Sequence, residues 1–260
     1  MSYYASITID DANPLKRLVQ RRRLTHGLRV LKSLPGNFDG TILDVGAGTG
    51  LLCEQLATRF PHARIVCYEP VPSLCAEATD ILLDYPGVEV VGQLDAISIP
   101  RFDFVFCLEV LEHLPRRETA NLLDTIEQRI APHSIVTFGV PNEVFAAAFA
   151  KGLFRFRRRR GSFDARWSHI WRAVIGRPPR HRPTSEIWPG IRYHYHHLGF
   201  DYRLLRRTLA RRFDVTDLYG SPLTRLPVLL NSEIYFVCRP RQSTSVPIPH
   251  ATVSRKRTAT

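Results

Sequence analysis

The sequence predicts an α/β fold in which helices cover both faces of a mostly parallel β-sheet. Short apolar runs alternate with amphipathic segments between residues 41 and 138. The runs lack the alternation of apolar and polar residues that is typical of a strand with one solvent-exposed face. With 260 residues, 44% of them hydrophobic, the chain can bury one large core. We therefore expect one doubly wound domain over 1–240 and a disordered polar tail over 241–260.

The expected elements follow one another along the chain. A helix over 12–33, capped by Asp11 or Asn13, comes first and belongs to an N-terminal segment, 1–35. Strands are expected at 41–45, 64–68, 88–91, 104–108 and 135–138, with helices over 49–60, 72–83 and 115–130. A strand–helix succession of this length is typical of a doubly wound sheet.

The pattern changes after Pro141. Residues 143–190 are rich in Arg and Trp, and we interpret them as an irregular cap insertion with an apolar helix near its start. Regular signals return as a helix over 201–212 and strands at 215–218 and 234–237. Because a turn-rich connection joins these two strands, we expect an antiparallel pair at the sheet edge.

Charge is distributed unevenly along the chain. The formal net charge is +12, yet residues 36–150 carry −10. Residues 151–182 carry +10, from eleven Lys or Arg against Asp164. An acidic block beside a basic one suggests that one part of the protein handles a cation and another part something anionic.

The cysteines and the hydropathy pattern indicate the cellular compartment in which we expect the protein. The five cysteines form no CxxC pair, and four of them lie among apolar residues, which favours buried free thiols in a reducing cytoplasm. The sequence has no apolar run of about 18 residues, and its start lacks the pattern of a secretory signal. We expect a cytoplasmic protein, with peripheral attachment to the inner membrane face as an alternative.

The most informative segment, D-V-G-A-G-T-G at 44–50, joins the first strand to a helix. Its glycines allow a tight turn and a close approach to a ligand. The spacing differs from the G-x-G-x-x-G of dinucleotide sites, and the carboxylate of Asp44 would repel a pyrophosphate but suits an ammonium group. Glu69, at the end of the second strand, can accept hydrogen bonds from ribose hydroxyls. A cationic nucleoside such as S-adenosylmethionine (SAM) meets these demands together.

Three motifs carry a family resemblance: D-V-G-A-G-T-G, the acid in I-V-C-Y-E-P, and F-D-F-V-F-C-L-E-V-L-E-H-L at 102–114. Over 38–142 and again over 194–238, the chain resembles the class I SAM-dependent methyltransferases, in particular the group that contains the ubiquinone-biosynthesis O-methyltransferases. The resemblance implies a Rossmann-like fold, SAM as cofactor and methyl transfer. It also implies a set of cofactor-binding residues: Asp44, Gly46, Ala47, Gly48, Gly50, Glu69, Pro70, Asp95, Ala96, Leu108 and Glu109. Tyr3 or Tyr4 either folds over the cofactor as a lid or packs as a hydrophobic staple.

Methyl transfer to a hydroxyl needs a base that removes the proton. His113 is the first candidate and His196 the second, with Glu109 lining the pocket beside the transferred methyl, whereas His194 and His197 are expected at the surface. The resemblance also implies, as an alternative, a divalent metal bound by Glu109, Glu112, His113 and His196. We do not favour this alternative. A purely structural role for the histidines is the third alternative.

The cap insertion bears on the acceptor. Residues 144–160 join an apolar helix to an Arg cluster, a pattern that fits a helix in a membrane interface, a helix packed over the active site, or a nucleic-acid contact. Nucleic acid is not favoured, because base-stacking aromatics do not clearly alternate with the basic residues. We expect O-methylation of a small-molecule or lipid-linked anionic acceptor. An RNA acceptor and a SAM-binding protein without turnover are the alternatives, and the oligomeric state stays open.

Overall fold

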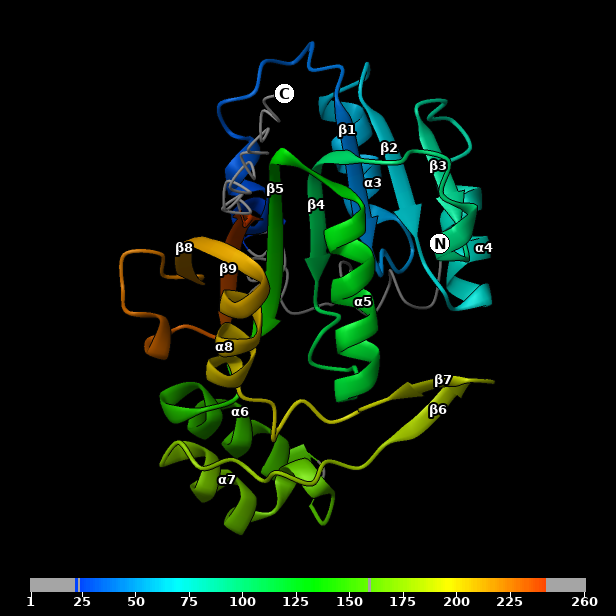
Figure 1. Ribbon diagram of the computed structural model, residues 1–260. Coiled ribbons are helices and arrows are strands. Elements are labelled where there is room, and N and C mark those ends of the chain that lie inside the picture. Colours follow the sequence, from blue (N-terminus) through cyan, green and yellow to red (C-terminus); the bar gives the residue numbers. More distant parts are fainter. Residues whose placement is uncertain (1–21, 23, 159, 242–260) are drawn as a thin grey trace, which may run out of the picture.

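The protein is represented by a computed structural model, which describes residues 22, 24–158 and 160–241. Its main feature is a seven-stranded sheet of order β3-β2-β1-β4-β5-β9-β8 (Figure 1). The strands are β1 (Thr41–Val45), β2 (Arg64–Tyr68), β3 (Val88–Val91), β4 (Phe102–Leu108), β5 (Ile130–Pro141), β8 (Phe213–Ser221) and β9 (Glu233–Pro240). Strands β1 to β5 pair in parallel, and β9 runs antiparallel to both β5 and β8. The predicted fold class is confirmed, including the antiparallel pair at the sheet edge.

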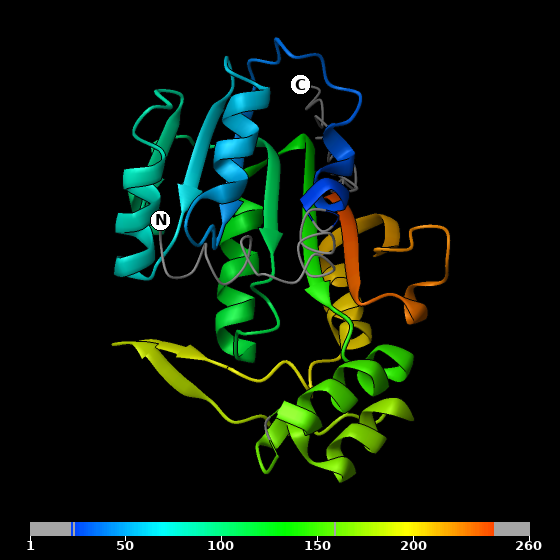
Figure 2. The same ribbon diagram turned by 180° about the vertical axis from the view of Figure 1, so that it is seen from behind.

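Helices cover both faces of this sheet. α5 (Arg116–Gln128) and α8 (Tyr202–Arg212) lie on the face toward the viewer in Figure 1. α3 (Leu51–Arg59) lies in front of the sheet in Figure 2 and shares its core with α4 (Pro72–Ile81) and the 3₁₀ helix η1 (Leu28–Leu31). A further 3₁₀ turn, η2 (Leu94–Ala96), follows β3.

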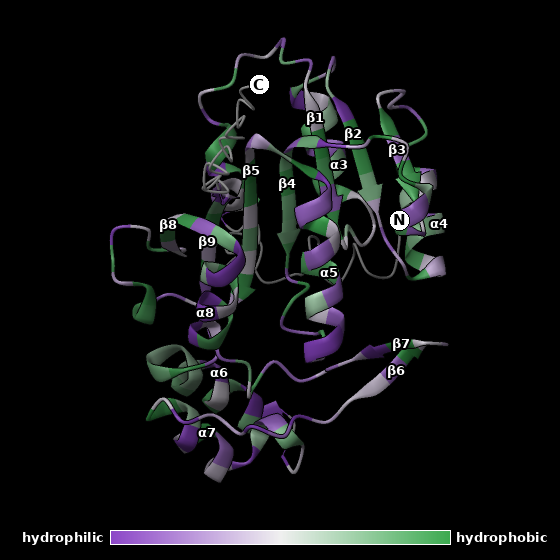
Figure 3. Ribbon diagram, in the orientation of Figure 1, coloured by the Kyte–Doolittle hydropathy of each residue, from purple (hydrophilic) through white to green (hydrophobic). Residues whose placement is uncertain are grey.

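Alternate residues of the strands bury on opposite faces. In β2, Ile65 and Cys67 belong to the core under α3, and Val66 belongs to the core under α5 and α8. Successive side chains of a strand point to opposite faces, so a strand covered on both sides must be apolar throughout. Figure 3 shows this as apolar strands between helices of mixed hydropathy. All five cysteines are free thiols, and four of them are buried as expected: Cys53, Cys67, Cys107 and Cys238.

A cap lies beyond the carboxyl ends of the parallel strands (Figure 1). It consists of α6 (Phe145–Arg158), η3 (Phe163–Ala165), α7 (Trp167–Val174) and the hairpin of β6 (Ser185–Trp188) and β7 (Ile191–Tyr193). The expectation of an irregular insertion with one helix is therefore incomplete. A last 3₁₀ turn, η4 (Val228–Leu230), contacts α6 from the loop between β8 and β9.

A buried ion pair fixes the cap to the sheet. The carboxylate of Glu143, two residues past β5 and fully buried, accepts bonds from Arg155 at 2.7 and 2.8 Å and from Lys151 at 3.2 Å. Although burial raises the pKa of a carboxyl, the charges of Lys151 and Arg155 lower that of Glu143 to about 2. Both basic residues belong to α6, so the first cap helix is held at a fixed position beside the strand ends.

Some expectations fall on segments beyond the described residues. Of the helix expected over 12–33, residues 22 and 24–27 are helical and lead into η1. The tyrosine lid at Tyr3 or Tyr4, and almost all of the tail, lie outside the described ranges. Within those ranges, none of the helices combines the length and the apolar character needed to cross a bilayer.

Candidate functional site

The loop after β1 turns sharply toward β2. The N–H groups of Gly46 and Ala47 both donate to the carbonyl oxygen of Tyr68, at 2.9 and 3.0 Å. Gly46 has a φ of +71°, and a Cβ there would lie 2.5 Å from Val110, so a side chain is excluded. At Gly48, with φ +59°, a Cβ would meet nothing within 4 Å. The loop therefore leaves open space beside a backbone that no side chain shields, as a cradle for a ligand requires.

Two buried carboxylates stand beside this loop. Asp44, near the end of β1, is 3% exposed, and its Oδ2 accepts a hydrogen bond from the thiol of Cys53 at 3.6 Å. Glu69, directly after β2, is 5% exposed and accepts from the N–H groups of Gly48 at 2.8 Å and Val71 at 2.9 Å. Among the described residues, neither carboxylate forms an ion pair with a Lys, Arg or His.

Burial shapes the protonation of both groups. It raises the pKa of Asp44 to about 7 and also raises that of Glu69, since a carboxylate is costly to ionise away from water. A cationic ligand would offset this cost at Asp44. Each oxygen of Glu69 keeps a second lone pair, which can accept a hydroxyl. The two residues therefore fit the cationic nucleoside expected from the sequence.

The other expected cofactor residues follow the same edge of the sheet. Asp95 and Ala96 are exposed on η2, after β3, and Gly50 is the N-cap of α3 with a φ of +81°. Because β1 to β4 are parallel, the residues at their carboxyl ends gather at one edge. Leu108 ends β4, and Pro70 directly follows Glu69. The structure thus brings the expected set together, and its contacts with a cofactor remain a prediction.

Glu109 has an unusual backbone conformation. Its φ is +59°, in the left-handed region that non-glycine residues rarely adopt, and its N–H donates to the carbonyl oxygen of Gly139 at 2.8 Å. Strained backbone of this kind clusters at functional sites. The turn directs the chain from the end of β4 into residues 110–114, which carry Glu112 and His113.

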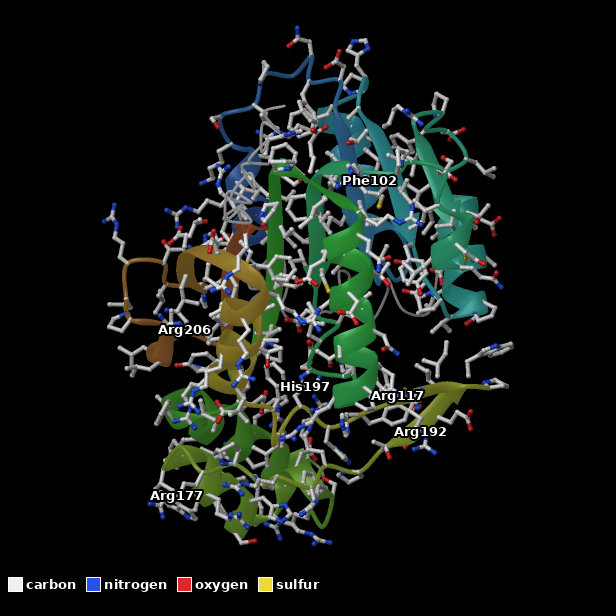
Figure 4. The ribbon with its side chains drawn as sticks, viewed as in Figure 1. Phe102, Arg117, Arg177, Arg192, His197 and Arg206 are labelled. Atoms are coloured by element: carbon white, nitrogen blue, oxygen red, sulfur yellow. The ribbon has the colours of Figure 1, made fainter. Side chains whose placement is uncertain are left out.

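His113 is held by the segment that follows the cap hairpin. Its Nδ1 lies 2.8 Å from the carbonyl oxygen of His194, and its own carbonyl oxygen accepts from the N–H of His194 at 2.8 Å. Tyr193 stacks on the imidazole, with ring centroids 4.2 Å apart and planes 9° apart. Its Nε2 lies 3.2 Å from Nε2 of His197. The expectation that His197 lies at the surface is therefore wrong, because this side chain turns inward to His113, between the sheet and the cap (Figure 4).

The hydrogen bonds fix the protons of this pair. Burial lowers the pKa of both imidazoles, that of His197 to about 4, so both are neutral near pH 7. The carbonyl oxygen of His194 can only accept, so the single proton of neutral His113 lies on Nδ1. Nε2 of His113 then accepts from Nε2–H of His197. This leaves Nδ1 of His197 as an acceptor.

His196, the second expected base, has different neighbours. Its Nδ1 lies 3.3 Å from the buried carboxylate of Asp164, which also approaches Arg155 at 3.5 Å. The carbonyl oxygen of His196 accepts from Arg182. The structure therefore places His196 among the contacts that hold the cap together, rather than beside His113.

The same region contains a potential metal-binding group. Glu112, His113 and His197 each offer one ligand atom, and these atoms lie within 4.8 Å of one another. Glu112 is fully buried, with Oε1 3.5 Å from Nε2 of His113. One carboxylate and two imidazoles fit Zn²⁺ or a similar metal better than Mg²⁺. This group differs from the ligand set that the resemblance implies: His197 joins Glu112 and His113, whereas Glu109 and His196 are not part of it.

Sequence reasoning missed His197 and Tyr193. Both lie in R-Y-H-Y-H-H-L at 192–198, where three histidines and two tyrosines alternate without a clear period. Which of them point inward depends on how the hairpin returns to the sheet. Adjacent histidines in this segment were the only available signal.

Comparisons with known proteins agree with this geometry. Residues 43–136 match the family model described as a methyltransferase domain. The chain is 34% identical over 118 residues to a ubiquinone biosynthesis O-methyltransferase from Yersinia enterocolitica, and the match covers 44% of this chain and 47% of that protein. It is 31% identical over 138 residues to a trans-aconitate 2-methyltransferase from Methylobacterium nodulans, covering 52% of this chain and 50% of that protein. The chain thus spans about half the length of the curated relatives it matches.

The fold has solved counterparts. The N-methyltransferase NodS from Bradyrhizobium japonicum, in complex with S-adenosylhomocysteine, aligns with a TM-score of 0.53 at 16% identity, covering 89% of this chain and 90% of that one. At this identity the likeness concerns the fold. The family match over 43–136, in contrast, includes both Asp44 and Glu69. Together, the glycine loop, the strand order and these matches show a similarity to the class I SAM-dependent methyltransferases, with the family match confined to residues 43–136.

Proposed function

We propose that the protein binds SAM at the carboxyl ends of β1 and β2 and transfers its methyl group to a hydroxyl oxygen of a small or lipid-linked anionic acceptor beneath the cap. One observation carries the proposal. Two buried carboxylates without a cationic side-chain partner in the described residues, Asp44 and Glu69, stand at the sheet edge on which the neutral imidazoles of His113 and His197 also gather.

The residues around the glycine loop suit the cofactor. SAM supplies a methyl group that is already activated by a sulfonium. Asp44 balances the positive charge of the ligand, and the carboxylate of Glu69 accepts hydrogen bonds from ribose hydroxyls. The open side of Gly48 gives the ligand access to the loop backbone. The protein's remaining task is to position the acceptor and remove its proton.

The histidine pair suits proton removal. In the proposed step, the acceptor O–H bond breaks, and its proton passes to Nδ1 of His197. The proton on Nε2 of His197 then moves 3.2 Å to Nε2 of His113, which becomes an imidazolium. The carboxylate of Glu112, 3.5 Å from that nitrogen, stabilises the charge. His113 keeps its orientation through the carbonyl of His194.

A cation from the cap favours an anionic acceptor. Arg182 is half-buried beside the histidines, and its Nε donates to the carbonyl oxygen of His196 at 3.1 Å. Burial lowers the pKa of Arg182 to about 10, so the guanidinium is charged at neutral pH. Its positive charge also acts on His113, whose pKa it lowers in addition to the effect of burial. A carboxylate or phosphate of the acceptor would find its counterion here.

The comparisons support a small-molecule acceptor over RNA. The two curated relatives are named for ubiquinone biosynthesis and for trans-aconitate, neither of which is a nucleic acid. They do not agree on one acceptor, so the proposal extends to the chemical class and not to a compound.

Transfer of a labelled methyl group tests the proposal. The protein is incubated with methyl-tritiated SAM and with lipid, small-molecule and RNA fractions of a cell extract. We expect label in the lipid or small-molecule fraction, and little with His197→Ala. Label in the RNA fraction alone would contradict the acceptor class. SAM binding without transfer to any fraction would contradict the enzymatic proposal.

A further inference from the structure

The outer side of α7 exposes an apolar stripe. Trp167, Trp171 and Ile175 are 37%, 53% and 63% exposed, and their spacing of four residues places them on one side of the helix. Phe149 of α6 extends this stripe, with its ring centroid 6.0 Å from that of Trp171. We call these four residues the α7 stripe. Such a run of large apolar side chains on a surface marks a docking site rather than chance exposure.

The flank of α7 next to the stripe is already used in packing. Ile170 and Ala173 are completely buried. Gly152 of α6 lies directly against Ile170, and a Cβ at this glycine would be 2.6 Å from that side chain. The helix is therefore seated on α6, and Trp167 of the stripe also packs on Phe156 of α6, with ring centroids 4.7 Å apart, whereas Trp171 and Ile175 keep more than half of their surface exposed.

Positive charge surrounds the α7 stripe. The exposed arginines of this region are Arg157, Arg158, Arg160, Arg166, Arg172, Arg177 and Arg180. Between Glu143 and Glu186 the sequence has one acidic residue, Asp164, and that residue is buried. The described part of the segment 144–185 thus exposes seven arginines and no acidic side chain.

The stripe lies on the outermost layer of the molecule. In Figures 1 and 2, α7 lies farther from the sheet than α6, on the side away from the strands. Figure 4 shows Arg177 at this outer boundary. A flat surface can therefore approach α7 without contact with the sheet.

We propose that the α7 stripe and its surrounding arginines dock the protein on a bilayer of anionic lipids. Tryptophan prefers the interface between hydrocarbon and headgroups, and Lys and Arg side chains near the interface are attracted to an anionic surface. A second copy fits this surface poorly, because it would bring two strongly cationic caps together. The inference does not depend on the proposed methyl transfer, since it rests on surface residues alone.

The structure also refines which helix makes the contact. The sequence pointed to residues 144–160, that is, to α6. In α6, however, Ala147, Ala148 and Gly152 are buried in the cap. The neighbouring helix α7 carries two exposed tryptophans, and α6 supports it and adds Phe149 to the stripe.

Tryptophan fluorescence tests the proposal directly, because the chain has three tryptophans and two lie in the stripe. Trp188→Phe removes the third, on the β6 strand, so that the remaining emission comes from α7. We expect brominated acyl chains in phosphatidylglycerol vesicles to quench this emission, and uncharged phosphatidylcholine vesicles to do so much less. Absence of quenching in anionic vesicles would overturn the proposal.

Vesicle flotation with matched variants separates the stripe from charge alone. Trp171→Ser with Ile175→Ser should weaken binding to phosphatidylglycerol vesicles by about tenfold or more, because each side chain contributes apolar burial. Leu83→Ser, at a residue that is 73% exposed between α4 and β3, should leave binding unchanged. Equal melting temperatures verify that the variants are folded. Equal binding of both variants, or binding to single-stranded RNA in place of vesicles, would overturn the proposal.

Discussion

Nε2 of His113 lies 3.2 Å from Nε2 of His197, and this contact joins the loop after β4 to the segment that returns from the cap. The two residues are 84 positions apart in the sequence. Because the backbone of His194 also bonds to His113, the pair has a fixed geometry. A proton can therefore pass between the imidazoles without rearrangement of either chain segment.

Of the adjacent residues His196 and His197, the contact with His113 predicts that His197 is needed for methyl transfer. His197→Ala should lower the rate of methyl transfer by roughly 10²- to 10⁴-fold, the usual contribution of a general base. Its affinity for SAM should remain, since the expected cofactor residues lie on other segments. Transfer rates and SAM titration of the same preparations check both parts.

His196→Ala is the matched control, one position away. Because His196 contacts Asp164, its loss should lower the melting temperature and leave transfer within a few-fold of the wild type. A larger loss of transfer in His196→Ala than in His197→Ala would show that the roles are reversed.

Chelation distinguishes a histidine base from a metal centre. With the proton relay as proposed, protein treated with EDTA should transfer methyl groups as fast as untreated protein. The measurement is the initial rate before and after dialysis, with Zn²⁺ or Mg²⁺ added back. A rate that falls on dialysis and returns with either ion would instead assign Glu112, His113 and His197 as metal ligands.

Asp44 should lower the stability of the ligand-free protein. Its pKa of about 7 lies above the ordinary 3.8, so folding favours the protonated form. The cost of the ionised form is absent below pH 3.8 and is complete above about pH 7. Asp44→Asn should therefore stabilise the ligand-free protein at about pH 8 by on the order of 1–3 kcal/mol, and much less at about pH 4.

Denaturant unfolding at both pH values measures this effect. Asp84→Asn, at an exposed position, provides the control for loss of one negative charge. If Asp44→Asn proved less stable than the wild type at both pH values, Asp44 would be a structural residue and not one reserved for a ligand.

Glu143 should stabilise the folded protein, whereas Asp44 destabilises it. Its pKa of about 2 lies below the ordinary 4.5, so its ion pairs contribute stability above pH 4.5 and lose it as pH falls toward 2. Glu143→Gln should cost about 3–5 kcal/mol near neutral pH, because it leaves Lys151 and Arg155 without their buried partner. The difference from the wild type should shrink in acid. A constant difference from neutral to acid pH would mean that packing, rather than charge, holds the cap.

The sheet could be predicted closely from the sequence, for a physical reason. β1, β2 and β3 have the bounds expected from their apolar runs. A strand that is buried on both faces must be apolar along its whole length, so its apolar run marks its extent. β4 and β5 extend beyond the expected residues, because Ile130 pairs with Phe102 across an irregularity that no periodicity reveals. The site residues on strand ends, such as Asp44 and Glu69, were predictable for the same reason.

The cap could not be predicted in this way. The apolar residues of the short helix α7 share one broad face, of which Ile170 and Ala173 are buried and Trp171 and Ile175 are exposed, so the sequence pattern does not tell which part of that face packs against the cap. The inward turn of His197 depends on long-range contacts with His113, and these are not encoded in local spacing. The role of His197 beside His113, the first base candidate, is therefore a proposal that rests on the structure.

Isothermal titration with SAM tests the central claim most directly. The wild-type protein should bind SAM at one site, and Asp44→Asn should bind it at least about tenfold more weakly, since a hydrogen bond to a charged group contributes about 1.5–3 kcal/mol. Asp80→Asn, an exposed carboxylate on α4, should bind as the wild type does. Absence of binding by the wild type, or equal affinity of wild type and Asp44→Asn, would contradict the assignment of the pocket.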